Sequence, residues 1–175
     1  MSLLRKRELI NLMQTQKWKP AIRALESNKR TYEDRELLWN LGWAYYKIGN
    51  LQRARTKFRK CVELGPEWDV AHLALGVVLL KTDQLPEARA SLRRSLAVQD
   101  SFLARRVLAL VYMKLRNYAK AERIWLEGLA LKPESAKMWH SYGCFLEDSH
   151  RMKEAKQAYS RARTLKKGSS SKDNA

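Results

Sequence analysis

The sequence predicts an all-α protein whose helices pair into hairpins and stack as a solenoid. Three observations lead to this prediction. The 175 residues include only 7 Gly and 4 Pro, too few for a sandwich or barrel with many tight turns. Apolar residues make up 45% of the chain and include 6 Trp, 7 Tyr and 3 Phe, so there is enough apolar surface to bury in a folded core. Alanine also recurs at spacings of 33 or 34 residues, each time within a helical pattern.

The second helix of each predicted hairpin is marked by an alanine followed four positions later by a large side chain. Residues four apart lie on one face of a helix, so each pair marks one packing face. The five pairs are Ala21 and Leu25, Ala54 and Phe58, Ala88 and Leu92, Ala121 and Trp125, and Ala155 and Tyr159.

The first helix of four hairpins is marked by a face with the spacing i, i+3, i+4, i+7, which includes one small residue. We expect this small residue to meet the alanine of the second helix, because two helices approach closely only where neither is bulky. Short turns such as Gly49-Asn50 and His150-Arg151 join the helices. The faces are Leu38, Leu41, Gly42 and Tyr45; His72, Leu75, Gly76 and Leu79; Arg105, Leu108, Ala109 and Tyr112; and Trp139, Tyr142, Gly143 and Leu146.

This pattern resembles the tetratricopeptide repeat, a helix-turn-helix unit of 34 residues, over about residues 2–166. The resemblance implies a right-handed superhelix of five hairpins whose concave side is lined by the first helices. The first unit departs from the pattern, because Leu9 stands where a small residue belongs, so we expect it to be a cap. The implied organisation is a single domain at 1–166, with repeats at about 2–34, 35–68, 69–101, 102–135 and 136–166, followed by a polar, disordered tail at 167–175.

Catalytic and metal-binding chemistry is not expected. The sequence has no GxxxxGK[ST], GxGxxG, HExxH or GxSxG motif. Cys61 and Cys144 lie far apart outside any CxxC or Cys/His cluster, which predicts two free thiols. His72 occupies a core-type position, where a hydrogen-bonded structural imidazole is expected. We therefore predict a non-enzymatic protein without a cofactor or metal. No apolar run is long enough to span a membrane, so we also predict a cytoplasmic location.

A second face of each first helix points away from its partner helix and forms the predicted concave groove. Trp39 and Trp43 dominate it, and aromatic side chains are frequent among binding hot spots. For some of these residues, such as Leu73 and Leu110, the alternative to a place in the groove is burial in the core. The candidate groove residues are Ile10, Met13, Trp39, Trp43, Tyr46, Lys47, Leu73, Val77, Leu80, Lys81, Arg106, Leu110, Met113, Lys114 and His140.

The groove chemistry favours a protein partner with apolar anchors and acidic residues. Lys47, Lys81 and Lys114 recur once per repeat along the groove, and regular cations select carboxylates. One subset of the tetratricopeptide-repeat family holds the acidic C-terminus of heat-shock chaperones, and this chain departs from that subset. Trp39 and Trp43 stand where that subset needs Lys and Asn. The sequence therefore predicts an adaptor or scaffold for another partner peptide or helix.

The basic balance of the chain supports an alternative function. Lys and Arg number 35 against 18 Asp and Glu, a net charge of +17. A basic convex face would attract RNA, a ribonucleoprotein or another polyanion without reading sequence, although net charge for solubility is the competing explanation. Association of the chain with itself is a further possibility. The predicted convex patch consists of Arg53, Arg59, Lys60, Arg93, Arg94 and Arg161.

Overall fold

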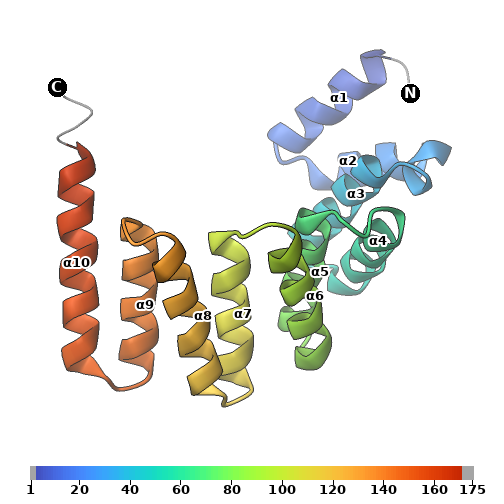
Figure 1. Ribbon diagram of the computed structural model, residues 1–175. Coiled ribbons are helices and arrows are strands. Elements are labelled where there is room, and N and C mark those ends of the chain that lie inside the picture. The colour runs from blue at the N-terminus through green and yellow to red at the C-terminus, as the bar shows by residue number, and fades with distance from the viewer. Residues whose placement is uncertain (1–2, 171–175) are drawn as a thin grey trace. The chain divides into compact units, whose positions relative to one another are not determined.

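The computed structural model describes residues 3–170, and within them the chain forms ten α-helices and one short 3-10 helix, without strands (Figure 1). The α-helices pair in chain order into antiparallel hairpins, which confirms the all-α prediction. The 3-10 helix η1 (Lys29–Tyr32) follows the first hairpin. The hairpins are α1 (Leu3–Gln14) with α2 (Trp18–Glu26), α3 (Arg35–Lys47) with α4 (Leu51–Leu64), α5 (Asp69–Lys81) with α6 (Leu85–Val98), α7 (Phe102–Lys114) with α8 (Tyr118–Leu131), and α9 (Ala136–Asp148) with α10 (Met152–Ser170).

The helices group into two compact units, Met1–Gln99 and Asp100–Ala175. In the first unit α4 packs against both α3 and α5, and α5 packs against α6. In the second unit α8 packs between α7 and α9, and α9 packs against α10. Each hairpin thus stacks on its neighbour within its unit, as in a helical-repeat solenoid. The single domain over 1–166 and the right-handed superhelix stay predictions.

The last helix differs from the expected boundary. α10 continues to Ser170, past the expected end at 166. Residues 167–170 of the predicted disordered tail are therefore helical. Residues 171–175 of the predicted polar tail lie outside the described residues. No helix in the described range has both the length and the apolar character needed to cross a membrane.

The same turn closes every hairpin. In the α3–α4 hairpin Gly49 has a φ of 80°, and the N–H of Asn50 donates to the carbonyl of Tyr45 at 2.9 Å. This is the Schellman arrangement, which satisfies the last carbonyls of a helix. The side chain of Asn50 then accepts from the N–H of Arg53 at 3.2 Å and caps α4. The other four hairpins use non-glycine residues with φ between 57° and 60°: Gln16, Asp83, Arg116 and His150.

A large side chain packs over the small residue in three hairpins. A Cβ built on Gly76 would lie 2.6 Å from Cγ of Leu92, and one built on Gly42 would lie 2.8 Å from Cε1 of Phe58. Side chains lean toward the N-terminus of their helix, so the residue four positions after the alanine reaches back over the alanine's turn. The alanine is itself buried, but the large side chain is what the glycine accommodates.

We predict that Gly76→Ala destabilises the protein by about 1–3 kcal/mol, even though Ala is intrinsically about 1 kcal/mol better than Gly in a helix. Leu92 is fully buried and has no room to move away from the added methyl group. Urea unfolding of Gly76→Ala, Leu92→Ala and the double variant measures the coupling. Gly76→Ala should cost less in the Leu92→Ala background, and strictly additive effects would contradict the packing argument.

Candidate protein-interaction surface

Four aromatic rings form a continuous series in the first unit, which we term the aromatic stack: Trp68, Trp39, Trp43 and Tyr46. The rings of Trp39 and Trp43 lie parallel with centroids 5.7 Å apart, and those of Trp43 and Tyr46 are 5.3 Å apart. Trp68 joins at the other end, 6.4 Å from Trp39. The series forms because residues 39, 43 and 46 lie on one face of α3.

The two central indoles have different surroundings. Trp39 packs against the buried cluster of Leu38, Cys61 and Ala71, and its Nε1 is buried without a hydrogen-bond partner among the described residues. Trp39 is therefore partly core. Trp43 is half-buried and leans on Trp39 on one side and Tyr46 on the other. Trp43 is thus the indole that is held in place yet accessible.

Positive charges lie against the rings of the stack. The Nζ of Lys47 lies 4.7 Å from the ring centroid of Trp43 and 5.9 Å from that of Trp18. The Nζ of Lys81 lies 5.7 Å from the ring centroid of Tyr46. A cation over an aromatic face is attracted by the ring quadrupole, which holds the lysine stems along the apolar surface. The surface therefore combines accessible aromatic area with ammonium groups.

Every predicted groove residue keeps some exposure, and none belongs to the fully buried core. Ile10 and Leu110 are the most exposed apolar members, at 46% and 43%. Leu73 is half-buried, so it is neither fully buried in the core nor fully exposed. Residues of the first unit are Ile10, Met13, Trp39, Trp43, Tyr46, Lys47, Leu73, Val77, Leu80 and Lys81, and residues of the second unit are Arg106, Leu110, Met113, Lys114 and His140.

Two aromatic residues of this surface escaped the sequence analysis. Trp68 is the N-cap residue of α5, at the last position of its repeat, and Trp18 is the first residue of α2. Neither residue lies on the face of a first helix where the groove was predicted. A tryptophan at a repeat boundary, where most repeats of this chain place a smaller residue, is the signal that would have found Trp68.

The predicted convex patch is largely neutralised by carboxylates. Its cations pair with glutamates of their own helix, of another helix or of a turn between helices, and Arg53 also donates to the hydroxyl of Tyr45 at 3.0 Å. Arg93 is the member without such a partner in the described part of the chain. The pairs are Arg53 with Glu26, Arg59 with Glu87, Lys60 with Glu63, Arg94 with Glu67 and Arg161 with Glu134.

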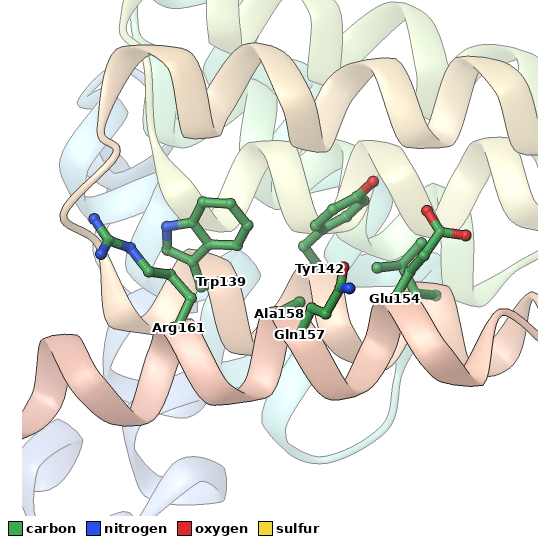
Figure 2. Close-up of a pocket in the computed structure, with 7 residues that line it drawn as sticks. Trp139, Tyr142, Glu154, Gln157, Ala158 and Arg161 are labelled. Atoms are coloured by element: carbon green, nitrogen blue, oxygen red, sulfur yellow. The ribbon is translucent and has the colours of Figure 1, made fainter.

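A pocket of about 340 Å³ in the second unit has aromatic walls and one charge of each sign at its rim (Figure 2). Trp139 and Tyr142 project from α9 toward this space, and Arg161 of α10 lies beside Trp139. The indole Nε1 of Trp139 donates to the carbonyl of Pro133 at 2.8 Å, and the Tyr142 hydroxyl donates to Glu122 at 2.8 Å. Both polar ends are satisfied, so the rings serve here to pack α9.

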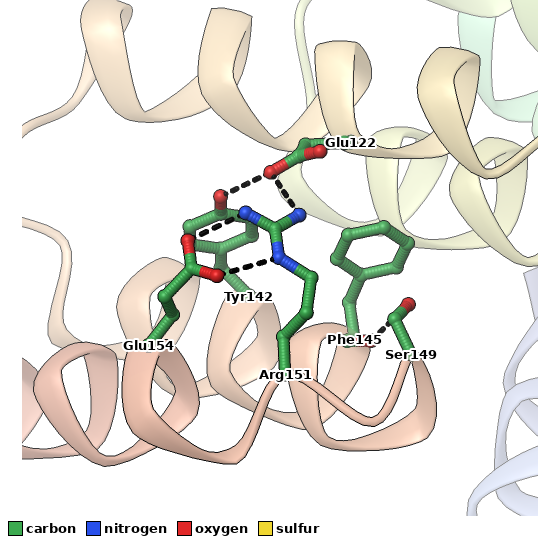
Figure 3. Close-up of polar contacts among 6 residues, drawn as sticks. All are labelled: Glu122, Tyr142, Phe145, Ser149, Arg151 and Glu154. Carbon is green, nitrogen blue, oxygen red and sulfur yellow. Dashed lines mark hydrogen bonds and ion pairs between the residues drawn. The ribbon is translucent and has the colours of Figure 1, made fainter.

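A network of Arg151, Glu122, Tyr142 and Glu154 links α8, α9 and α10 next to that pocket (Figure 3). The guanidinium of Arg151 donates to Glu122 of α8 at 2.7 Å and to Glu154 of α10, with the nearer of two contacts at 2.5 Å. Burial and the hydrogen bond to Glu122 raise the pKa of the Tyr142 phenol above its ordinary value. The hydrogen bonds from Arg151 lower the pKa of Glu154. The network joins the fifth hairpin to α8.

Family models identify the repeats. One model of the tetratricopeptide repeat matches residues 35–68, and a second model of the same repeat matches residues 106–170. Together they cover more than half of the chain. The chain belongs to the tetratricopeptide-repeat family. It is therefore, in general terms, a protein-interaction scaffold.

Solved structures of MamA share the tetratricopeptide-repeat fold of this chain. The structure of MamA from Desulfovibrio magneticus RS-1, beginning at its residue 41, is 25% identical, covers 94% of each chain and has a TM-score of 0.79. A crystal structure of MamA that is 23% identical covers 98% of each chain with a TM-score of 0.77. A search of curated proteins finds no match. These similarities establish the fold.

His72 and Cys61 are buried parts of the tetratricopeptide repeats. His72 is buried, with its Nε2 2.8 Å from the carbonyl oxygen of Pro66, as its core position predicts. Within the described residues no group of three His, Cys, Asp or Glu side chains is arranged to hold a metal ion. Burial raises the pKa of the Cys61 thiol to about 12, whereas Cys144 is exposed.

We predict that one thiol per folded chain reacts with a thiolate-specific reagent at neutral pH, and that the second reacts only after unfolding. Cys61 is buried and stays protonated, and only the thiolate is nucleophilic. Mass spectrometry after iodoacetamide treatment counts the modified residues. Cys144→Ser should remove the fast reaction, and a fast reaction that persists in this variant would contradict the burial of Cys61.

We predict that Glu154 contributes stability that acid removes. Its folded pKa lies below the ordinary 4.5, so the contribution is complete above pH 4.5 and is lost as the pH falls through the lowered value. Urea unfolding as the pH falls below 4.5 should show a smaller loss of stability in Glu154→Gln than in the wild type. Glu33→Gln, which removes an exposed carboxylate outside the Arg151 network, is the control. Equal losses in both variants would contradict the role of Arg151.

Proposed function

We propose that the protein is an adaptor that binds an apolar, partly acidic peptide or helix of a partner protein on the aromatic stack of its first unit. The observation that carries this proposal is the position of Trp43, half-buried between Trp39 and Tyr46 with the ammonium group of Lys47 against its ring. Such a surface offers apolar area and positive charge at one place.

Preorganisation supports the proposal. Trp39 is anchored on the core cluster of Leu38, Cys61 and Ala71, and the parallel rings hold Trp43 against it. A side chain that is already immobilised loses little conformational entropy when a ligand covers it. Tryptophan is also among the residues most often found as binding hot spots. Trp43 is therefore proposed as the main anchor for the partner.

The charge of the site supports an acidic partner. The ammonium groups of Lys47 and Lys81 lie beside two neighbouring rings of the stack. A carboxylate of the ligand would pair with either lysine while an adjacent apolar side chain covers Trp43. The exposed or half-buried Ile10, Met13, Leu73, Val77 and Leu80 of the first unit extend the proposed surface, and Arg106, Leu110, Met113, Lys114 and His140 stay predicted sites of the second unit.

Binding of RNA through the convex patch is less favoured. Five of its six cations already face a glutamate, so a phosphate would have to compete with an existing ion pair. Exposed ion pairs contribute little free energy, so they would weaken phosphate binding only slightly. RNA binding therefore stays a prediction, but no observation favours it over the adaptor proposal.

We predict that Trp43→Ala weakens partner binding at least about tenfold, the effect of a hot-spot tryptophan. Selecting random peptides on the wild-type protein should enrich sequences with a large apolar residue next to Asp or Glu. Fluorescence anisotropy then compares the affinity of an enriched peptide for the wild type, for Trp43→Ala and for Lys47→Glu with Lys81→Glu. The charge-reversed variant should also bind weakly.

Tyr118→Ala is the matched control, because Tyr118 is an exposed aromatic residue of the second unit outside the stack. Its affinity should equal that of the wild type. An affinity of Trp43→Ala for the enriched peptide equal to that of the wild type would contradict the proposal. Loss of affinity of about a thousandfold between 50 and 200 mM salt, as for contact with about six phosphates, would favour the polyanion alternative.

A further inference from the structure

A second pocket of the second unit, about 750 Å³ in volume, opens between α9 and α10. It is separate from the aromatic stack and from the pocket of Figure 2, with which it shares no lining residue. Its volume is in the usual range of ligand sites. We call it the helix-acceptor pocket. Its lining residues are Ala136, Lys137, His140, Tyr159, Ala162, Arg163 and Lys166.

The second hairpin shows what normally fills this position. When Gly42 is aligned with Gly143, the pocket residues Tyr159 and Ala162 correspond to Phe58 and Cys61. Cys61 is fully buried in a cluster with Ala71, the third residue of the next helix, α5. The position equivalent to the helix-acceptor pocket is therefore occupied by a helix.

The fourth hairpin repeats the arrangement. Gly128 aligns with Cys61 and Ala162, and a Cβ built on Gly128 would lie 2.8 Å from the Sδ of Met138. Met138 is the third residue of α9, just as Ala71 is the third residue of α5. Two hairpins thus place the third residue of the following helix against this point. In the fifth hairpin no residue of the described range takes that place.

Corresponding side chains are more exposed in the fifth hairpin than in the second. Phe58 is 1% exposed, whereas the corresponding Tyr159 is half-buried. Trp39 is half-buried beneath its neighbours, whereas the corresponding His140 is exposed. The fifth hairpin thus has a pocket at the position where the second and fourth hairpins accept a helix, with Ala162 at its base and Tyr159 and His140 accessible beside it.

The charge of the pocket identifies the kind of helix. Lys137, Arg163 and Lys166 surround it, where the second hairpin has Glu36, Val62 and Gly65. A second copy of this chain is a poor occupant, because the chain has a net charge of +17. Like charges brought together oppose association. An acidic helix is complementary.

We propose that the helix-acceptor pocket binds an amphipathic helix of a partner protein, with a small or medium apolar residue on Ala162 and Asp or Glu residues facing Lys137, Arg163 and Lys166. This is helix-in-groove recognition at a position that the chain itself uses for α5 and α9. The site lies in the second unit and is independent of the aromatic stack.

The test uses a stapled helical peptide of roughly fifteen residues with Ala and Leu at i, i+3, i+4 and i+7 and Glu on both flanks. A matched peptide carries Lys in place of every Glu. Fluorescence anisotropy with the full chain should show binding of the Glu peptide only. Arg163→Glu with Lys166→Glu should weaken binding of the Glu peptide at least about tenfold. Circular dichroism checks that each variant keeps its helices.

Lys153→Glu with Lys156→Glu is the control, since it makes the same charge change at exposed positions of α10 outside the pocket. This variant and Trp43→Ala should bind the Glu peptide as the wild type does. The proposal fails if the Glu peptide does not bind, if both peptides bind equally, or if both double variants weaken binding alike. A dimer in sedimentation that Arg163→Glu with Lys166→Glu dissociates would instead identify a second copy as the occupant.

Discussion

The structure depends on one packing contact, in which a large side chain of the second helix fills the space over a glycine of the first. Leu92 over Gly76 and Phe58 over Gly42 are two examples. Protein interiors are close-packed, so a single methyl group at the glycine would have to displace fully buried atoms. The close approach of the two helices fixes their relative orientation, and with it the direction in which the opposite face of each first helix points.

The aromatic stack follows from that orientation. Phe58, which fills the space over Gly42, is also a neighbour of Trp39, with ring centroids 6.5 Å apart. Trp39 therefore belongs to the packing of the hairpin on one side and to the stack on the other. Trp43, one helical turn later, is half-buried and lies between Trp39 and Tyr46. The site is rigid because its base is a part of the fold.

The sequence predicted the hairpins because the repeating small and large residues encode a contact between neighbours in the chain. It also predicted that the faces of Trp43 and Leu73 would differ from the buried faces, since helical spacing decides which side a residue occupies. The sequence pattern did not predict the ion pairs. Arg59 meets Glu87 and Arg94 meets Glu67 because neighbouring hairpins stack in one register, and that register depends on the fitted side chains rather than on any local pattern.

The turns carry a consequence for how such a chain changes over evolution. Asn50 ends α3 through its N–H and starts α4 through its side chain, so the loop supplies the hydrogen bonds that both helix ends need. The turn of such a hairpin needs no hydrogen bond from the segments before and after the hairpin. Duplication can then add a whole hairpin, and deletion can remove one, when the apolar faces on either side still match.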